Sequence, residues 1–258
     1  MQSEQRNKAI AGVVAALLVA MGAYFWLRKP AEEPTPPPPS PAAAVEEPEH
    51  HPVPDAAEPK VVLPELADSD QTMIEALTAL FSAKSIDQFL VPQDVVRHIV
   101  VSIDNLPRKK VAERLKPVKP IAGQFIVGGP EEARVLSEDN YSRYQPFVHV
   151  VSATDMNQVA NAYFKFYPLF QTAYADLGYP NAYFNDRLVQ VIDHLLATPD
   201  VAGPIKLTQP SVMYEFADPK LESLSAGQKA LIRVGKTNAA VLKTKLRELR
   251  VAVAKKPK

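Results

Sequence analysis

The sequence contains no cysteine among its 258 residues. This absence excludes a disulfide framework, a thiolate metal site and a catalytic thiol, and it leaves the redox compartment open. The sequence also has no excess of one charge, because 29 basic and 29 acidic residues give a formal net charge of zero. A nucleic-acid-binding protein usually carries a strong excess of positive charge, so the composition argues against nucleic acid as a partner.

Motifs of several enzyme classes are also missing. The adjacent Gly128 and Gly129 precede Pro130 and two glutamates, without the GxGxxG or Lys-Ser/Thr element of a phosphate-binding loop. The sequence has no Gly-x-Ser-x-Gly elbow and no HExxH motif. It therefore predicts no metal site and no cofactor. The adjacent His50 and His51 could bind a metal weakly, but we interpret them as solvated loop residues.

One apolar run, residues 9–27, carries no charge. At 1.5 Å per residue it is long enough to cross a hydrocarbon core of about 30 Å. Tyr24 and Trp26 near its end are typical of a membrane interface. A cleaved signal peptide is the alternative, because Ala20 and Gly22 resemble a small-residue cleavage site. The run continues past them, which favours an uncleaved, single-span anchor.

Basic residues flank this run on both sides, so the positive-inside rule gives nearly equal weight to the two orientations. We expect the short N-terminus to remain in the cytoplasm and the large C-terminal part to be exported. The sequence then divides into five parts, which are a tail (1–8), the anchor (9–27), a linker (28–60), a globular domain (61–254) and a basic tail (255–258).

The predicted linker, residues 28–60, is rich in proline, alanine and glutamate and has almost no large apolar residue. Such a segment cannot bury enough apolar surface to fold, so we expect it to be disordered. A proline-rich chain favours the polyproline II conformation at about 3.1 Å per residue, so the linker reaches on the order of 90 Å when extended.

The predicted globular domain, residues 61–254, is mainly α-helical with one small β-hairpin. Apolar residues at helical spacing after Asp68 and Ser69 predict a first helix. Residues 93–106 also favour a helix, although their β-branched content leaves a strand open. Residues 124–136 predict the hairpin, residues 205–216 are extended or helical, and residues 225–234 and 238–253 predict two closing helices.

Residues 163–198 form the centre of this domain and predict a helical hairpin. The first helix covers roughly residues 155–177, with a kink or restart expected at Pro168 and a left-handed cap at Gly178. Pro180 and Asn181 supply a break and a capping side chain for the second helix. Nine aromatic residues crowd the hairpin, and we favour a buried core over a surface that stacks on sugars or a partner peptide. They are Tyr163, Phe164, Phe166, Tyr167, Phe170, Tyr174, Tyr179, Tyr183 and Phe184.

The polar face of the second helix carries the candidate site. Asp186, Asp193 and His194 are the candidate catalytic residues, because closely placed acids and bases can transfer protons. Candidate binding residues are Arg187 and Gln190 on the same face and Glu215 from a distant segment. A solvated helix face explains the same pattern and is the interpretation we favour.

Asp193 does not fit the simplest form of that interpretation. It lies in the last turn of its helix, where the helix dipole disfavours a negative charge. We therefore predict a fixed cationic partner, with Arg108, Lys229 or Arg187 as the candidates.

The last helix has a narrow apolar stripe bordered by basic residues. Leu242, Leu246, Leu249 and Val253 form the stripe. It favours a helix that docks on the domain while its lysines extend into solvent. Contact with anionic lipid, cell-wall polymer or an acidic partner is the alternative.

Several motifs in the region after the linker resemble a bacterial family without an assigned activity, the domain of unknown function 3014 family. The motifs are residues 63–70 (LPELADSD), 101–107 (VSIDNLP), 178–180 (GYP), 184–188 (FNDRL), 191–196 (VIDHLL), 214–219 (YEFADP) and 225–229 (SAGQK). The resemblance implies a bacterial envelope protein with an N-terminal membrane segment, and it implies no activity.

We therefore expect a single-pass protein of the bacterial inner membrane with a periplasmic domain. The domain is expected to be a binding or scaffolding module that contacts an envelope protein or a cell-wall polymer, with its oligomeric state left open. The alternative is an acid/base hydrolase or lyase of envelope material that uses Asp186, Asp193 and His194.

Overall fold

The computed structural model describes residues 50–53 and 62–254. The predicted anchor, the two tails and most of the predicted linker lie outside the described residues. Among the described residues, no helix is both long and apolar enough to cross a membrane.

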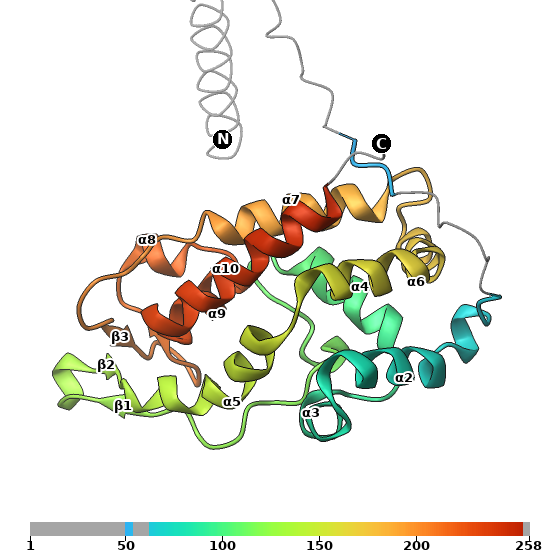
Figure 1. Ribbon diagram of the computed structural model, residues 1–258. Helices are drawn as coiled ribbons and strands as arrows, with labels where there is room; N and C mark the ends of the chain where they lie inside the picture. Colours follow the sequence, from blue (N-terminus) through green and yellow to red (C-terminus); the bar gives the residue numbers. More distant parts are fainter. Residues whose placement is uncertain (1–49, 54–61, 255–258) are drawn as a thin grey trace, which may run out of the picture. The chain divides into compact units, whose positions relative to one another are not determined.

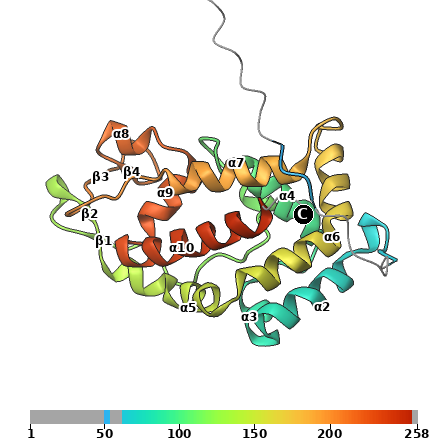
Figure 2. The ribbon, with the colours of Figure 1, turned by 45° about the horizontal axis from the view of Figure 1, so that its top comes forward.

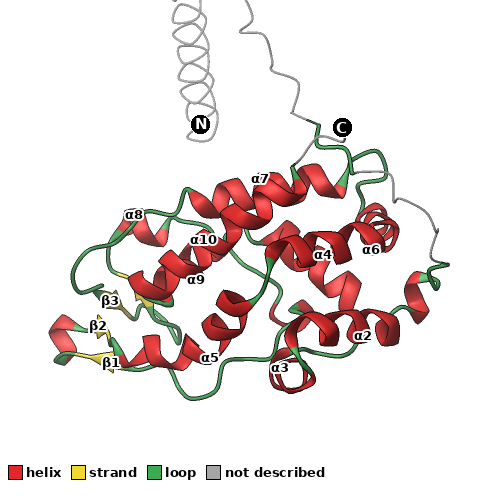
Figure 3. Cartoon of the chain, viewed as in Figure 1, coloured by secondary structure: helices red, strands yellow, loops and turns green. Residues whose placement is uncertain are grey.

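The described part of the chain is mainly α-helical, as the sequence predicts (Figures 1 and 3). Its helices are α2 (Asp70–Phe81), α3 (Ala83–Phe89), α4 (Val95–Asn105), α5 (Asp139–Ala153), α6 (Met156–Asp176), α7 (Phe184–Leu196), α8 (Pro219–Glu222), α9 (Ala226–Arg233) and α10 (Lys236–Val253). Short 3-10 helices cover Leu66–Asp68, Glu113–Leu115 and Glu131–Ala133. The sequence left residues 93–106 open between helix and strand, and α4 is helical. Helices α3, α5 and α8 were not predicted.

Two short antiparallel ribbons complete the fold. Strands β1 (Val127–Gly128) and β2 (Val135–Leu136) form the predicted hairpin. Strands β3 (Leu207–Thr208) and β4 (Glu215–Phe216) form a second ribbon in the segment that the sequence left open. Backbone hydrogen bonds of 2.8 Å, from Leu136 N to Ile205 O and from Leu207 N to Arg134 O, join the two ribbons.

Helix α6 follows the prediction closely. The Asp155 carboxylate accepts a hydrogen bond from Asn157 N at 2.8 Å and begins the helix. The helix is continuous through Pro168, so the restart that the sequence left possible there does not occur. At its end Gly178 has a positive φ of 113°, and Tyr179 N donates to Tyr174 O, which is the predicted left-handed cap.

The expected cap of α7 is wrong. Tyr183, not Asn181, precedes the first helical residue, and no side chain in that position caps the helix. Instead Gln171 on α6 accepts a hydrogen bond from Phe184 N at 2.9 Å. Gln171 also donates to Ala182 O at 2.8 Å, so a residue of the preceding helix fixes both the turn and the start of α7.

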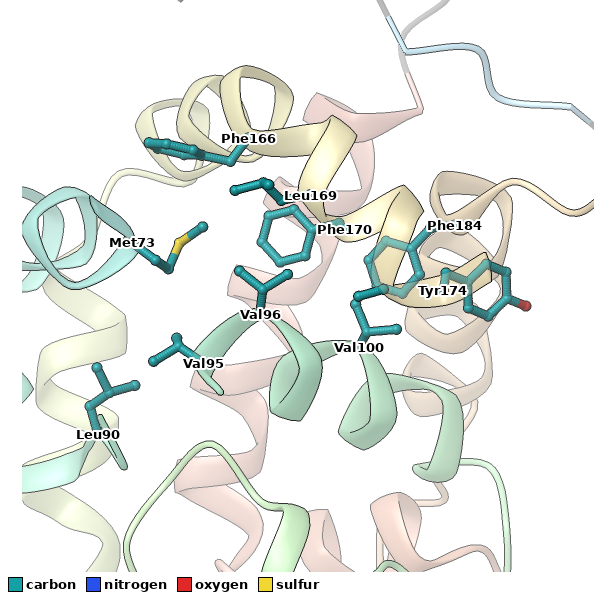
Figure 4. Close-up of a cluster of buried hydrophobic side chains, with 11 residues drawn as sticks. Met73, Leu90, Val95, Val96, Val100, Phe166, Leu169, Phe170, Tyr174 and Phe184 are labelled. Atoms are coloured by element: carbon teal, nitrogen blue, oxygen red, sulfur yellow. The ribbon is translucent and has the colours of Figure 1, made fainter. Parts of the chain in front are cut away.

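The aromatic residues of the α6–α7 hairpin mostly form core, as predicted. Phe166, Phe170, Tyr174 and Phe184 are buried against the valines of α4 (Figure 4). Phe170 and Phe184 stack with ring centroids 6.0 Å apart. Tyr183 is the exception, because its side chain is exposed.

Helix α10 closes the domain by packing against α5, α6 and α7 (Figure 2). Its last turn buries Ala252 and Val253 beside Ala160 of α6 and Ile192 of α7. Helix α10 therefore docks on the domain, as the sequence predicts. One of its bordering lysines does not extend into solvent as expected, because Lys243 is only 7% exposed.

Candidate functional site

The candidate residues of α7 do lie on one polar face, but each contacts a different part of the chain. Asp186 lies at the start of the helix and holds residues 50 and 51. Its Oδ1 accepts a hydrogen bond from His51 N at 2.7 Å, and its Oδ2 lies 2.9 Å from His50 Nδ1. Asp186 is therefore a docking point for the end of the predicted linker.

The neighbouring Asn185 completes this attachment. Its Nδ2 donates to His51 O at 2.8 Å and to Val253 O at 3.0 Å, so it ties residues 50–53 to the last turn of α10. His51 is only 8% exposed, which corrects the expectation that both histidines are solvated. The backbone N–H and the backbone C=O of His51 are both hydrogen-bonded to α7. Contacts made through the backbone leave no pattern in the sequence, so the linker sequence could not indicate them.

Arg187 joins α7 to α4 through a buried carboxylate. Its Nε lies 2.9 Å from Asp104 Oδ1, and its Nη2 donates to Asp104 O at 2.8 Å. Asp104 is 2% exposed and also accepts from Arg108 Nη2 at 2.5 Å. Gln190 accepts from Arg187 Nη1 at 2.6 Å, so the two candidate binding residues of α7 belong to one brace between two helices.

Asp193 has the fixed cationic partner that its position predicts, but the partner is Arg250 of α10 rather than any of the three candidates. Arg250 Nη2 lies 2.9 Å from Asp193 Oδ2, and Arg250 Nε donates to Oδ1. The two side chains are 37% and 45% exposed, for Arg250 and Asp193 respectively. The pair therefore lies at the surface.

His194 contacts the start of α9. Its Nε2 lies 2.8 Å from Ser225 Oγ, and Ser225 forms a capping box with Gln228. Gln228 Nε2 in turn donates to His194 O at 3.2 Å. His194 thus supports a helix start.

Glu215 lies on β4, and no hydrogen bond or ion pair joins it to α7 within residues 50–53 and 62–254. Acid–base catalysis requires an acid and a base that reach the same reacting atoms. Asp186, Asp193 and His194 instead point to three separate partners. The same described residues contain no group of three or more histidines and carboxylates that could hold a metal ion.

A cavity of about 590 Å³ lies elsewhere in the domain, and the sequence analysis did not find it. Strand β2, the start of α5, the loop 198–205, α9 and the first half of α10 surround it. Its walls are mixed, because the buried apolar residues Leu136, Ile205, Ile232 and Ala239 line it together with charged and hydroxyl side chains.

One buried cation lines this cavity. Lys243 Nζ donates to Thr198 O at 2.7 Å and to Asp200 Oδ1 at 2.8 Å. The hydrogen bond and the charge of Lys243 lower the pKa of the Asp200 carboxyl, and the charges of Lys236 and Arg247 act in the same direction. The cavity thus has apolar residues in its wall and a buried ammonium, paired with an exposed carboxylate, at its edge.

Tyr141 of α5 also lines the cavity, and its ring packs against the backbone of Gly235. Burial raises the pKa of the Tyr141 hydroxyl, and the charge of Glu138 raises it further. The hydroxyl therefore stays protonated and able to donate a hydrogen bond well above neutral pH.

Comparison with known proteins gives one match. The model of a family described as "Protein of unknown function (DUF3014)" matches residues 95–250. This range contains α4 to α7, the cavity and nearly all of α10, and it excludes residues 50–53. No curated protein and no solved structure matches the chain. Because the family model covers more than half of its length, the chain belongs to the DUF3014 family.

Proposed function

We propose that the chain is a single-span, membrane-anchored protein of the bacterial envelope whose domain is a binding module, with the cavity beside Lys243 as the binding site. The position of that cavity carries the proposal. It lies at the N-terminal half of α10, whereas residues 50–53 attach at the C-terminal end of the same helix. With 18 residues, α10 is about 27 Å long, so the cavity is well separated from the attachment point.

This separation suits a tethered binding domain. The apolar run 9–27 supports the anchor, and the proline-rich residues 28–49 reach up to about 70 Å in the polyproline II conformation. Because Asp186 and Asn185 hold the chain at residues 50 and 51, the tether enters the domain at one fixed point.

The geometry favours binding over the hydrolase or lyase alternative. Each candidate acid or base on α7 contacts a different structural element, and no second group is directed at a common reacting atom. The cavity, in contrast, has the size of a small-molecule site and a wall that is apolar in part.

The membrane anchor is tested by reporter fusions after Lys258. A reporter that is active only after export should be active, and a reporter that requires the cytoplasm should be silent. A charge in the middle of the apolar run, Leu18→Arg, should abolish the export signal, because a central arginine costs about 2.5–3.5 kcal/mol on insertion scales. The opposite pattern of activities would refute the proposed orientation.

The binding role is tested separately in cells. A photo-crosslinking amino acid at Val201, which lines the cavity, should give a covalent product. The same amino acid at Val251, an exposed position at the far end of α10, is the matched control and should give none of that product. Equal products at both positions, or none at Val201, would contradict a binding role for the cavity.

A further inference from the structure

We propose that the cavity binds an amphiphilic carboxylate, a molecule with one aliphatic chain and one carboxylate, and that the carboxylate binds Lys243 Nζ. The inference deepens the proposed binding role and rests on it, but it does not depend on the membrane anchor. It follows from the walls of the cavity, from the position of its one buried cation, and from the unequal exposure of the groups paired there.

The walls suit an aliphatic chain. Leu136, Ile205 and Ile232 are buried apolar residues from three different elements, and Ala239 leaves space beside them. A volume of about 590 Å³ lies inside the range of roughly 300–1,000 Å³ that is typical of small-molecule sites. Each methylene group that leaves water for such walls contributes about 0.8 kcal/mol, or about fourfold in affinity.

The buried cation suits an anionic head group. An ammonium group has three donors, and Lys243 uses two of them, on Thr198 O and Asp200 Oδ1. Among the described residues no third acceptor contacts Lys243. A carboxylate at this position would form a charge-assisted hydrogen bond with the buried ammonium, and such bonds are stronger than neutral ones.

The charged residues that line the cavity determine whether its ligand is an anion or a cation. Four charged residues line the cavity, namely Lys236, Lys243, Glu138 and Asp200. Of these Lys243 is the buried one, whereas the Asp200 side chain is 73% exposed and Glu138 is exposed as well. The buried ammonium of Lys243 would repel a cationic ligand. An anionic ligand can replace the Asp200 side chain, because Asp200 lies on the loop 198–205 and its side chain can rotate toward the solvent.

Asp200 therefore occupies the place of the ligand carboxylate. This assignment makes an unusual prediction, because removal of a charged lining residue should improve binding. Asp200→Asn should bind the carboxylate several-fold more tightly, since it removes a competing anion from Lys243. Lys243→Met should bind it about tenfold to a hundredfold more weakly, which is the range for a lost hydrogen bond to a charged group.

The experiment uses the full chain in phosphatidylcholine nanodiscs and dodecanoic acid with a terminal diazirine as the probe. After irradiation, mass spectrometry should place the label on the loop 198–205 or on the first half of α10. Unlabelled dodecanoate should displace the probe. All variants are compared in the same lipid, so that partition of the probe into the bilayer is common to all of them.

Matched variants separate the contribution of the ligand's aliphatic chain from that of its carboxylate head group. Ala239→Leu fills the cavity and should prevent labelling, whereas Ala240→Leu makes the same change at the next, exposed position and should have no effect. Lys243→Met should weaken competition by dodecanoate but not by dodecanol. Because Lys243→Met also removes the hydrogen bonds to Thr198 O and Asp200 Oδ1, a thermal melt of each variant shows whether the fold persists. Asp200→Asn tests the assignment independently.

Three results would overturn the inference. They are equal competition by dodecanoate in Lys243→Met and the unchanged protein, weaker binding in Asp200→Asn, and displacement by phosphatidic acid in the nanodisc but not by dodecanoate. The last would assign the site to a phospholipid head group. A crosslinked product at Val201 in cells together with any of these results would leave the binding role intact and refute only the ligand class.

Discussion

Asp104 and Asp193 are two aspartates that contact arginines across helices, and they should differ sharply in their effect on stability. Asp104 is 2% exposed and accepts hydrogen bonds from both Arg108 and Arg187. The substitution Asp104→Asn keeps the shape of the side chain and removes its charge. Arg187, whose side chain is mostly buried between α4 and α7, then loses its ionic partner.

The expected loss follows from what remains around Arg187. The backbone oxygen of Asp104 and the side chain of Gln190 still accept hydrogen bonds from Arg187, and the exposed Arg108 can return to water. A buried ion pair that loses one partner costs about 3–5 kcal/mol. Because Arg187 keeps two acceptors, we expect the lower end, about 3 kcal/mol. For a domain of this size that corresponds to a decrease in Tm of roughly 6–12 °C.

Asp193→Asn is the matched control, because it makes the same chemical change in a pair with Arg250 that is exposed on both sides. Exposed ion pairs contribute about 0.2–1 kcal/mol, so its Tm should fall by no more than roughly 4 °C. Thermal melts followed by circular dichroism at neutral pH measure both variants. Two equal decreases, or a larger decrease for Asp193→Asn, would refute the argument that burial determines the cost.

Three further predictions concern other contacts. Burial acts to raise the pKa of Glu222, but hydrogen bonds from Lys229 and from a backbone amide outweigh it and hold the pKa below 4.5. The carboxylate therefore stabilises the fold above about pH 4.5. The difference in Tm between the unchanged protein and Glu222→Gln should shrink as the pH falls below that value. Asp186→Ala removes both contacts to residues 50 and 51, so limited proteolysis should cut next to His50 faster, whereas Asp193→Asn should leave that rate unchanged. Gly235→Ala should destabilise by more than about 1 kcal/mol in urea unfolding, because φ is 88° and the new Cβ would lie 2.5 Å from the ring of Tyr141.

Periodicity predicted α2, α4, α6, α7, α9 and α10 but not α5, because it reports only a helix with one clearly apolar face. Most apolar residues of α7 are buried as predicted, and the predicted polar residues lie on the opposite face, whereas the polar Asn185 is buried against the expectation. The same reasoning failed for Lys243, which borders the apolar stripe of α10. Its burial depends on the loop at Thr198 and Asp200, more than 40 positions earlier in the chain.

The partners of individual polar side chains were less predictable than the positions of the helices. The helix dipole correctly indicated that Asp193 needs a cation, but the cation comes from Arg250, 57 residues away. Asn181 has the residue type that usually caps a helix, yet Gln171 from the preceding helix satisfies the first backbone amide of α7. A local signal of this kind shows that a group must be satisfied, and the tertiary fold decides which residue satisfies it.

The polar face of α7 and the buried lysine of α10 therefore call for different explanations. Helix α7 is contacted by α4, α9, α10 and residues 50–53, and its polar side chains bind those neighbours. In the brace with α4 the Asp104 carboxylate is buried and the Arg187 side chain is mostly buried, and the two charges satisfy each other. Lys243 differs, because a buried ammonium is paired with a carboxylate that is mostly in water. Such a partner offsets the cost of burying the charge only weakly, and helix packing alone does not require it. A cation held in this way beside an open cavity is the arrangement expected of a residue that binds an anion from outside the chain.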